Sequence, residues 1–307
     1  MDLLDFDAIL FHGMELNVWD LPVERSTKQW YVFVNFDNPV NRPQVNHLYE
    51  DYFNITMTYR LDSDIVWTYG IIKDIVTDEI VAPLPNTSWN SYNRSGDSEG
   101  DSRLTTQIAG KSKPVIWFVS NCMAQSGRFE YATELSKHIG VDIYGRCGMY
   151  NCSHGEDCFD IVERDYSFYL SFENALCGDF VTDHLYNALR YNVVPIVYGG
   201  ANYSLFAPPE SHINALHFET PRDLAVYLKW LMRNPEEYRK YFEWKKYYKI
   251  DSGVRRAVCN LCKFLHEERK PRWYNEISKW YSVGRCPLHR FLDSAKYITW
   301  NILNNQD

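Results

Sequence analysis

Between residues 114 and 198, short apolar runs alternate with segments of helical periodicity, and this alternation constrains the fold more than any other feature of the sequence. Apolar residues at helical spacing occupy Gly127–Ile139 and Asp179–Tyr191. Runs typical of buried strands cover Pro114–Val119, Val141–Tyr144, Tyr166–Phe172 and Val193–Tyr198. Strands that alternate with helices of about 10–15 residues indicate parallel βαβ units. This region is therefore predicted to be a Rossmann-like α/β domain.

An open parallel sheet binds ligands at the carboxyl ends of its strands, so the residues just after each predicted strand are candidates for function. Glu173-Asn174 follows one strand and Gly199-Gly200 follows another. A third strand is followed by a polar loop that ends at Arg128, where the next helix begins. A carboxylate here can accept hydrogen bonds from ribose hydroxyls, and an arginine or a helix N-terminus suits a phosphate. Because the sequence has neither GxGxxG nor GxxxxGK[ST], a dehydrogenase or a P-loop enzyme is disfavoured.

The rest of the chain differs in character from this domain. Upstream, Asp7–Phe11 and Trp30–Phe36 are predicted strands, and the second ends in the turn signal Asp37-Asn38-Pro39. Pro83–Lys113 is rich in Pro, Ser, Asn and Gly, which indicates a linker or a long exposed loop. After Pro221 the predicted helices are Arg222–Met232, Pro235–Tyr248, Val254–Glu268 and Arg272–Tyr281. The predicted organisation is an N-terminal domain over 1–82, a linker over 83–113, a second domain over 114–253 and C-terminal helices over 254–307.

Charge and aromatic content narrow the class of ligand. The 307 residues carry 32 Lys and Arg against 40 Asp and Glu, a net charge of -8. A chain without a broad basic surface is not expected to bind nucleic acid. Aromatic residues make up 16% of the sequence. Their flat faces suit stacking on sugar rings, although most aromatic side chains serve the core.

Two features favour the secretory pathway, although no stretch approaches the roughly 20 apolar residues of a membrane helix and the first residues do not form a signal peptide. Eight cysteines are compatible with disulfides in an oxidising compartment. Asn-x-Ser/Thr acceptor sequences begin at Asn54, Asn86, Asn93, Asn151 and Asn202. Cys259 and Cys262 form a CxxC pair, for which a disulfide is favoured over zinc because no matching second pair of ligands is present.

The segment Tyr166–Asn174, together with Asp179–Leu189, resembles the signature region of the α1,3-fucosyltransferases, glycosyltransferase family 10 and most similar to its invertebrate members. That region typically contains Y-K-F-Y-L-x-F-E-N followed by D-Y-V-T-E-K-L-x-N-A-L. The similarity extends over roughly residues 7 to 300. It continues through Val194–Gly200, Asn202-Tyr203, Ala207–Ile213, Val119–Asn121 with Arg128, Asn35–Pro39 and Tyr59–Ile65, the last of which matches Y-R-x-D-S-D-I.

The resemblance implies a GT-B fold, an α/β architecture with two Rossmann-like domains and C-terminal helices that pack back on the first domain. It implies inverting transfer of L-fucose from GDP-fucose to the 3-hydroxyl of a GlcNAc in a glycoprotein or glycolipid glycan. No cofactor is then required, Mn2+ or Mg2+ would act as stimulants, and no metal site is expected. The full-length protein would be a type II membrane protein of the Golgi lumen, with the membrane reached through an N-terminal anchor that this chain lacks.

The resemblance also assigns roles to individual residues. Asp37 falls where the family has its catalytic Glu, the base that removes the acceptor proton. Arg128 would contact the pyrophosphate and Glu173 the ribose or fucose hydroxyls. The remaining residues expected to bind the donor are Asn174, Asp183, His184 and Tyr203.

Three positions depart from the family pattern. Asp37 is one methylene shorter than Glu, and a displacement of about 1 Å can cost on the order of 100-fold in rate. Ser167 and His184 stand where the family has Lys, so two cations on the diphosphate side are replaced. Two alternatives therefore stay open: a non-catalytic or weakly active homologue that binds a glycan or nucleotide, and a GT-B transferase that uses another nucleotide sugar.

Each candidate residue also has a structural interpretation. Asp37 beside Asn38-Pro39 is typical of a turn cap, and Glu173 of a cap for the segment that follows it. Arg128 is compatible with an exposed helix position, and His184 with a packing residue on the apolar edge of its helix. Asp62-Ser63-Asp64 has the spacing of a metal-binding D-x-D motif but is interpreted as structural.

Overall fold

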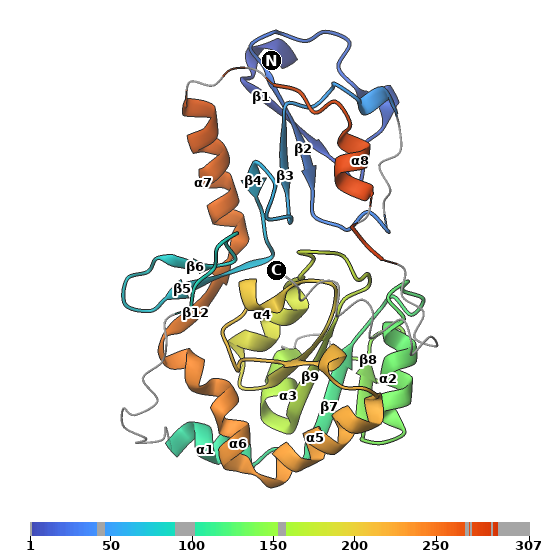
Figure 1. Ribbon diagram of the computed structural model, residues 1–307, viewed down its shortest axis with the longest axis vertical. Coiled ribbons are helices and arrows are strands. Elements are labelled where there is room, and N and C mark those ends of the chain that lie inside the picture. The colour runs from blue at the N-terminus through green and yellow to red at the C-terminus, as the bar shows by residue number, and fades with distance from the viewer. Residues whose placement is uncertain are drawn as a thin grey trace.

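The computed structural model describes residues 2–41, 47–89, 102–152, 158–267, 270, 272–283 and 285–287. Two α/β halves lie one above the other, with a small third sheet beside their junction (Figure 1). The upper half in that view contains the N-terminal strands, and the lower half contains the larger sheet.

The N-terminal sheet is parallel, in the order β1-β2-β3-β4, and short 3-10 turns accompany it. Its strands are β1 (Ala8–His12), β2 (Trp30–Asn35), β3 (Ile55–Thr58) and β4 (Ile65–Val66), and the turns are η1 (Leu3–Asp5), η2 (Val18–Asp20) and η3 (His47–Tyr49). Strand side chains alternate between faces. Accordingly, Val32 and Val34 of β2 belong to one buried cluster, and Tyr31 and Phe33 belong to another.

Helices from the end of the chain cover both faces of this sheet. Helix α7 (Gly253–His266) contributes Phe264 to the cluster that holds Val32 and Val34. Helix α8 (Ile277–Ser282) packs on the opposite face. The prediction that C-terminal helices pack back on the first domain is confirmed. The predicted helix over Arg272–Tyr281 begins only at Ile277, because the preceding backbone hydrogen-bonds to the N-terminal half instead.

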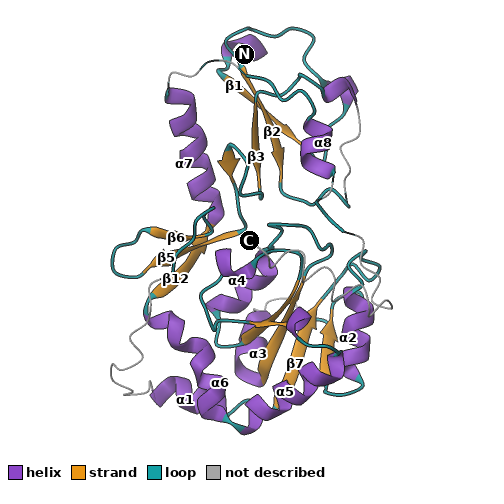
Figure 2. Ribbon diagram, in the orientation of Figure 1, coloured by secondary structure: helices purple, strands orange, loops and turns teal. Residues whose placement is uncertain are grey.

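The larger sheet is also parallel, in the order β11-β10-β9-β7-β8, with helices on both faces (Figure 2). Its strands are β7 (Lys113–Phe118), β8 (Val141–Tyr144), β9 (Tyr166–Phe172), β10 (Val194–Tyr198) and β11 (Ile213–Asn214). Its helices are α2 (Arg128–Ser136), α3 (Cys158–Asp165), α4 (Asp183–Arg190) and α5 (Pro221–Arg233), with 3-10 turns η4 (Tyr203–Leu205) and η5 (Ala215–His217). Every residue of the central strand β9 is buried. The βαβ prediction is thus confirmed.

The helix predicted from Asp179 begins four residues later than expected. Asp179 has a φ of 59°, which lies in the left-handed region and is incompatible with a helical start. Thr182 is the N-cap, and its side chain accepts a hydrogen bond from the His184 N–H. Glu173 and Asp183 are therefore separated by a loop that leaves the sheet before α4 begins.

An antiparallel sheet that the sequence did not predict lies beside the junction, in the order β12-β5-β6. Its strands are β5 (Gly70–Asp74), β6 (Ile80–Ala82) and β12 (Tyr248–Ser252). Pro235–Tyr248 is consequently not one helix but α6 (Pro235–Arg239), the 3-10 segment η6 (Lys240–Lys246) and the first residue of β12. The predicted linker contains helix α1 (Ser102–Ala109), while residues 90–101 of it lie outside the described residues.

Six cysteines form the disulfides Cys122–Cys147, Cys152–Cys158 and Cys177–Cys286. The disulfide favoured for the CxxC cysteines is wrong for this chain, because Cys259 and Cys262 are both free and exposed on α7. Asn54 is 2% exposed, and its side chain bonds the backbone of Tyr31 and Arg272, so this sequence motif is not accessible for glycosylation in the folded chain. Among the described residues, none of the helices has the length and apolar character to cross a membrane.

Candidate functional site

The loops that follow β2 and β9 meet at the junction of the two halves. Asn38 follows β2 and donates from Nδ2 to Asn174 Oδ1, which follows β9, over 2.8 Å. Asp37 and Glu173, the predicted base and the predicted donor ligand, immediately precede these two asparagines. Tyr281 of α8 donates its hydroxyl proton to the Asp37 backbone oxygen, so the C-terminal helix also reaches the junction.

Asp37 is half-buried, and neighbouring amides hold its carboxylate in place. Oδ1 accepts hydrogen bonds from the Asn38 N–H at 2.8 Å and from Asn41 Nδ2 at 2.9 Å, and Oδ2 lies 3.1 Å from the same Nδ2. These contacts are those of the turn-cap interpretation. They also hold the Asp37 carboxylate beside the Asn38–Asn174 bond.

Glu173 lies at the carboxyl end of β9 and is 1% exposed. Its Oε1 accepts from the Thr182 N–H at 2.8 Å and from the Thr182 hydroxyl at 3.2 Å, which fixes the loop before α4. Burial raises the pKa of the Glu173 carboxyl to about 8, against the smaller opposing effects of the Thr182 bonds and the Arg128 charge. At neutral pH the carboxyl is therefore mostly protonated and has a hydrogen to donate.

Arg128 is the first residue of α2, but it is not an exposed helix residue, since only 5% of it is accessible. Its guanidinium donates from Nη1 to the Phe172 backbone oxygen at 2.6 Å and from Nη2 to the Asn121 backbone oxygen at 3.2 Å. The guanidinium carbon also lies 5.6 Å from the Trp117 ring centroid. Arg128 therefore ties the end of β9 to the loop after β7.

The two predicted donor ligands on α4 face different ways. Asp183 is exposed in the first helical turn, where it accepts a hydrogen bond from Asn187. His184 Nδ1 lies 3.1 Å from the Tyr169 hydroxyl, against the central strand. Burial lowers the pKa of His184 below its usual 6.5, so the ring is neutral at pH 7. These contacts are those of the packing interpretation of His184, and they do not supply a cation.

A cavity of about 690 Å³ opens at the carboxyl ends of β9 and β10. The Gly199-Gly200 turn forms one wall, and a Cβ at Gly199 would lie 2.3 Å from the Tyr203 hydroxyl oxygen. Tyr203 is 4% exposed and lines the cavity, and among the described residues its hydroxyl has no hydrogen-bond partner. The predicted donor residue Tyr203 thus lines the cavity, with its hydroxyl oxygen buried and without a partner among the described residues.

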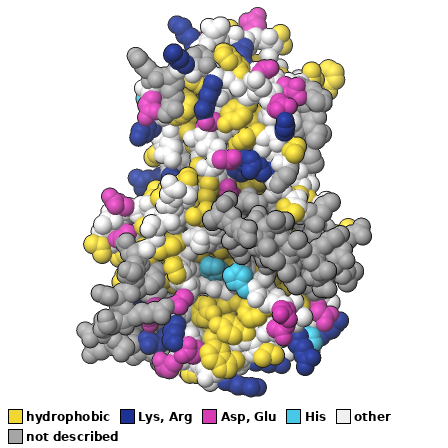
Figure 3. All heavy atoms as spheres, in the orientation of Figure 1, with side chains coloured by type: hydrophobic (Ala, Val, Ile, Leu, Met, Phe, Trp, Pro, Cys, Tyr) yellow, Lys and Arg dark blue, Asp and Glu magenta, His cyan; other side chains and the backbone are white. Residues whose placement is uncertain are grey.

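Sequence reasoning missed several residues that line this cavity. His212, Asn214 and His217 come from β11 and its flanks, and Asp179 and Arg285 lie on the loop before α4 and just beyond α8. Burial lowers the pKa of His212 to about 4, so His212 is neutral. Figure 3 shows histidine side chains at the surface near the middle of the molecule, with hydrophobic side chains below them. Asp179 and His212 lie within the matched segments Asp179–Leu189 and Ala207–Ile213 but had no assigned role. No motif marks Asn214, His217 or Arg285, because their position depends on the sheet order and on the path of the C-terminal segment.

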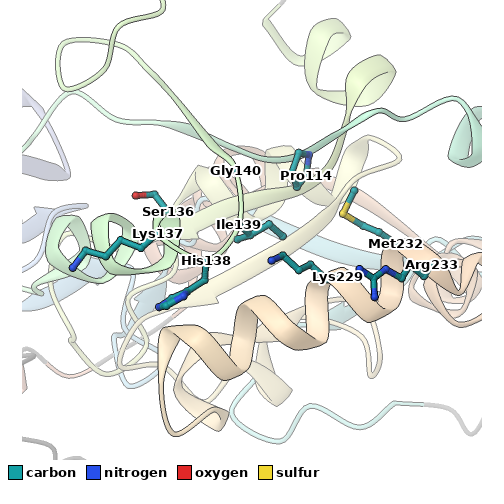
Figure 4. A pocket seen from close by; sticks show the side chains of 9 residues that line it. All are labelled: Pro114, Ser136, Lys137, His138, Ile139, Gly140, Lys229, Met232 and Arg233. Carbon is teal, nitrogen blue, oxygen red and sulfur yellow. The ribbon is translucent and has the colours of Figure 1, made fainter.

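A second hollow, of about 680 Å³, lies near the amino ends of the strands of the large sheet (Figure 4). Lys137, Lys229 and Arg233 line it, but their side chains do not converge on one point in Figure 4. They lie in or next to the last turns of α2 and α5, where cations offset the partial negative charge of helix C-termini. Helix termini therefore account for these charges, and parallel sheets bind ligands at the other edge.

Within the described ranges, no three His, Cys, Asp or Glu side chains are arranged to hold a metal ion. The D-x-D sequence at Asp62 and Asp64 is occupied by protein groups. Arg60 donates to both oxygens of Asp62, and the Thr56 N–H donates to Asp64 Oδ2 over 2.8 Å. Both carboxylates thus serve the packing of the N-terminal half.

Two sequence families match the chain. Residues 108–280 match the family described as "Glycosyltransferase family 10 (fucosyltransferase) C-term", and residues 2–70 match "Fucosyltransferase, N-terminal". The chain therefore belongs to glycosyltransferase family 10 and is an enzyme of the α1,3-fucosyltransferase class.

Individual relatives agree with this assignment. Alpha-(1,3)-fucosyltransferase C of Drosophila melanogaster is 38% identical over 292 residues, which cover 92% of this chain and 67% of that protein. Glycoprotein 3-alpha-L-fucosyltransferase A of the same organism is 37% identical over 287 residues, 84% of this chain and 52% of that one. This chain thus spans about half to two thirds of their length. A crystal structure of α1,3-fucosyltransferase with GDP-fucose has a TM-score of 0.52 at 16% identity, covering 81% of this chain and 78% of that one. This likeness confirms the GT-B fold.

Proposed function

We propose that this protein transfers L-fucose from GDP-fucose, with inversion, to the 3-hydroxyl of a GlcNAc in a glycoprotein or glycolipid glycan. Family membership and the names of the relatives support fucose transfer. The observation that carries the proposal is the 2.8 Å hydrogen bond between Asn38 and Asn174. This bond brings a carboxylate of the N-terminal half next to the carboxyl end of β9, where an open α/β sheet binds its ligand.

In this proposal the residues act as follows. Asp37 removes the proton of the attacking hydroxyl, with its carboxylate oriented by Asn38 and Asn41. Glu173 and Asn174 bind the donor from the end of β9, and the Tyr203 hydroxyl gains its partner there. Positive groups must offset the charge that develops on the leaving diphosphate. Arg128 acts through the backbone that it holds, whereas Asp183 and His184, at the start of α4, stay in the proposal as donor residues that supply no positive charge.

No metal takes part in the proposed reaction, and Mn2+ or Mg2+ acts only as a stimulant. The proposed location is the Golgi lumen, with the full-length protein anchored as a type II membrane protein. The three disulfides fit an oxidising compartment of this kind. Chelation with EDTA is accordingly expected to leave most of the transfer activity in place.

The test combines nucleotide binding with transfer to a panel of glycans that end in GlcNAc or N-acetyllactosamine. GDP should raise the melting temperature, whereas UDP and ADP should not. Asp37→Asn should lower transfer by at least about 100-fold while GDP still binds. Asp74→Asn, at the last residue of β5, where the side chain accepts from the Val76 N–H, is the matched control and should leave transfer unchanged.

Each outcome separates one alternative. Stabilisation by UDP in place of GDP would favour a GT-B transferase with another donor. GDP binding without transfer to any acceptor would favour a non-catalytic homologue. Full transfer by Asp37→Asn would remove Asp37 as the base.

A further inference from the structure

Arg285 reaches the cavity at the carboxyl ends of β9 and β10 from a distant part of the sequence. It lies just after α8, which packs on the N-terminal sheet, and it lines the cavity together with the Gly199-Gly200 turn and Tyr203. We propose that Arg285 is the cation that binds the diphosphate of the nucleotide sugar, held in place by the disulfide between Cys177 and Cys286. This inference rests on the proposed function, because it assumes a diphosphate donor.

Two ties fix the Arg285 backbone to the loop after β9. The Cys177–Cys286 disulfide joins the residue after Arg285 to this loop. Next to it, the Gly178 N–H donates to the Arg285 backbone oxygen over 3.0 Å. The loop also contains Glu173 and Asn174, so the position of Arg285 is coupled to that of two proposed donor residues. A covalent tie reduces the conformational freedom that an arginine would lose on binding an anion.

The charges around the cavity are compatible with diphosphate binding by Arg285. Among the described residues that line it, Arg285 is the sole Lys or Arg. Arg128 does not line it, because its guanidinium is turned to the backbone oxygens of Phe172 and Asn121. The nearby His212 is neutral. Of the Lys and Arg side chains of the described residues, Arg285 is therefore the one placed to compensate the charge of an anion in this cavity.

The acidic residues near Arg285 do not prevent this role. Asp179 lines the cavity, but its Oδ2 already accepts a hydrogen bond from the Leu61 N–H at 3.2 Å. Asp62 Oδ2 lies 3.5 Å from Arg285 Nη2, and the two side chains are 49% and 44% exposed. Exposed pairs of this kind contribute little. A diphosphate, with more charge and two oxygens for a bidentate contact, can therefore replace Asp62 as the partner of the guanidinium.

The contribution would grow during the reaction. As the bond between fucose C1 and the β-phosphate oxygen breaks, its electron pair stays on that oxygen and the diphosphate gains charge. The acceptor oxygen forms the new bond to C1, and its proton goes to Asp37. A guanidinium at the diphosphate stabilises this charge more strongly in the transition state than in the ground state. Removal of Arg285 should therefore lower kcat as well as raise KM.

The test measures inhibition of fucose transfer by GDP and by guanosine, which lacks the phosphates. Arg285→Gln should weaken GDP by about 10- to 100-fold, the range for a charge-assisted hydrogen bond, and leave guanosine within about twofold. Arg285→Lys keeps the positive charge but not the paired N–H donors of the guanidinium. Its inhibition by GDP should lie between that of the wild type and that of Arg285→Gln. Arg222→Gln, exposed at the start of α5, is the control for loss of a surface charge and should change neither value.

The role of the disulfide is tested in the variant Cys177→Ala/Cys286→Ala. Its affinity for GDP should fall. Adding Arg285→Gln to this variant should weaken GDP binding by less than about a further twofold, because the arginine is no longer positioned. An equal loss in both backgrounds would overturn the positioning role. If that variant does not fold, the Gln and Lys variants still decide the binding role. Unchanged GDP inhibition in Arg285→Gln, or an equal loss for guanosine, would overturn it. A wild-type chain that does not bind GDP at all would instead refute the proposed function.

Discussion

The two halves of the molecule cover their sheets in different ways. The large sheet packs against α2, α3, α4 and α5, which lie between or directly after its own strands in the sequence. The N-terminal sheet is instead covered by α7 and α8, from the other end of the chain. The C-terminal segment therefore completes the half that carries Asp37, and Tyr281 of α8 bonds the Asp37 backbone directly. Assembly of the site depends on a segment remote from it in sequence.

The two halves also place the carboxyl groups of the site in different environments. Asp37 is half-buried and accepts hydrogen bonds from the backbone and side-chain amides of Asn38 and Asn41. Glu173 is fully covered, and the desolvation of its charged form outweighs its bonds to Thr182. A base must be oriented toward the proton that it removes, whereas a ligand for sugar hydroxyls can accept or donate a hydrogen bond. The two environments match these two proposed roles.

The largest expected effect tests the cover that α7 gives to the N-terminal sheet. Phe264 is 5% exposed and packs edge-on against Trp30, with ring centroids 5.2 Å apart. Phe264→Ala should lower the free energy of unfolding by about 3–5 kcal/mol. Hydrogen exchange should show the loss of protection in β2 and β3 before β9 and β10.

Leu228→Ala on α5 is the matched variant for the other half. Leu228 is fully buried in the cluster of the large sheet, so its truncation should cost about 2–5 kcal/mol and affect β7 and β9 first. If both variants weakened protection equally throughout the chain, the halves would unfold as one unit. The different cover of the two sheets would then not give them separate stabilities.

A smaller effect concerns the pH dependence that Glu173 gives to the large half. Its pKa is raised from 4.5 to about 8, so the folded chain binds more protons than the unfolded one between these values. The stability contributed by Glu173 is fully present below about pH 4.5 and is lost as pH rises through 8. Glu173→Gln should therefore reduce the change in the free energy of unfolding across this pH range by on the order of 3 kcal/mol. Denaturant unfolding at several pH values measures this.

Glu219→Gln is the control, since it makes the same substitution at an exposed position before α5. It should leave the profile unchanged. A wild-type profile that rises from pH 5 to pH 8 with the same slope in Glu173→Gln would show that burial does not raise the pKa of Glu173 in the folded chain.

The large sheet was predictable because its signals are local. The strand over Tyr166–Phe172 was placed at its observed bounds, and β7, β8 and β10 were placed to within a residue at either end. Runs of buried residues and helical spacing follow from packing on both faces of a parallel sheet. The motif residues Glu173 and Asn174 could be located because an open sheet places them at a known edge.

The third sheet and the cavity residues were not predictable in this way. Strand β12 pairs with β5 across a separation of about 180 residues. The strand conformation of Tyr248–Ser252 depends on this distant pairing, so the local sequence does not indicate it. The role of Arg285 depends on the Cys177–Cys286 disulfide, whose connectivity cannot be read from spacing. The separate domain boundaries at residues 82 and 113 stay predictions.

The smallest expected effect compares two cysteine pairs. Cys177–Cys286 joins the loop after β9 to the segment beyond α8, and so ties the two halves together. Cys259 and Cys262 lie within one helix, exposed and unbonded, and constrain nothing. Thiol titration of the folded chain without reductant should find both as reactive groups. Cys259→Ser/Cys262→Ser should remove them and change the free energy of unfolding by less than about 0.5 kcal/mol, since both positions are on the surface. A folded chain that shows these thiols only after reduction would mean that the helix carries a bonded pair, and the contrast between the two pairs would then be one of position alone.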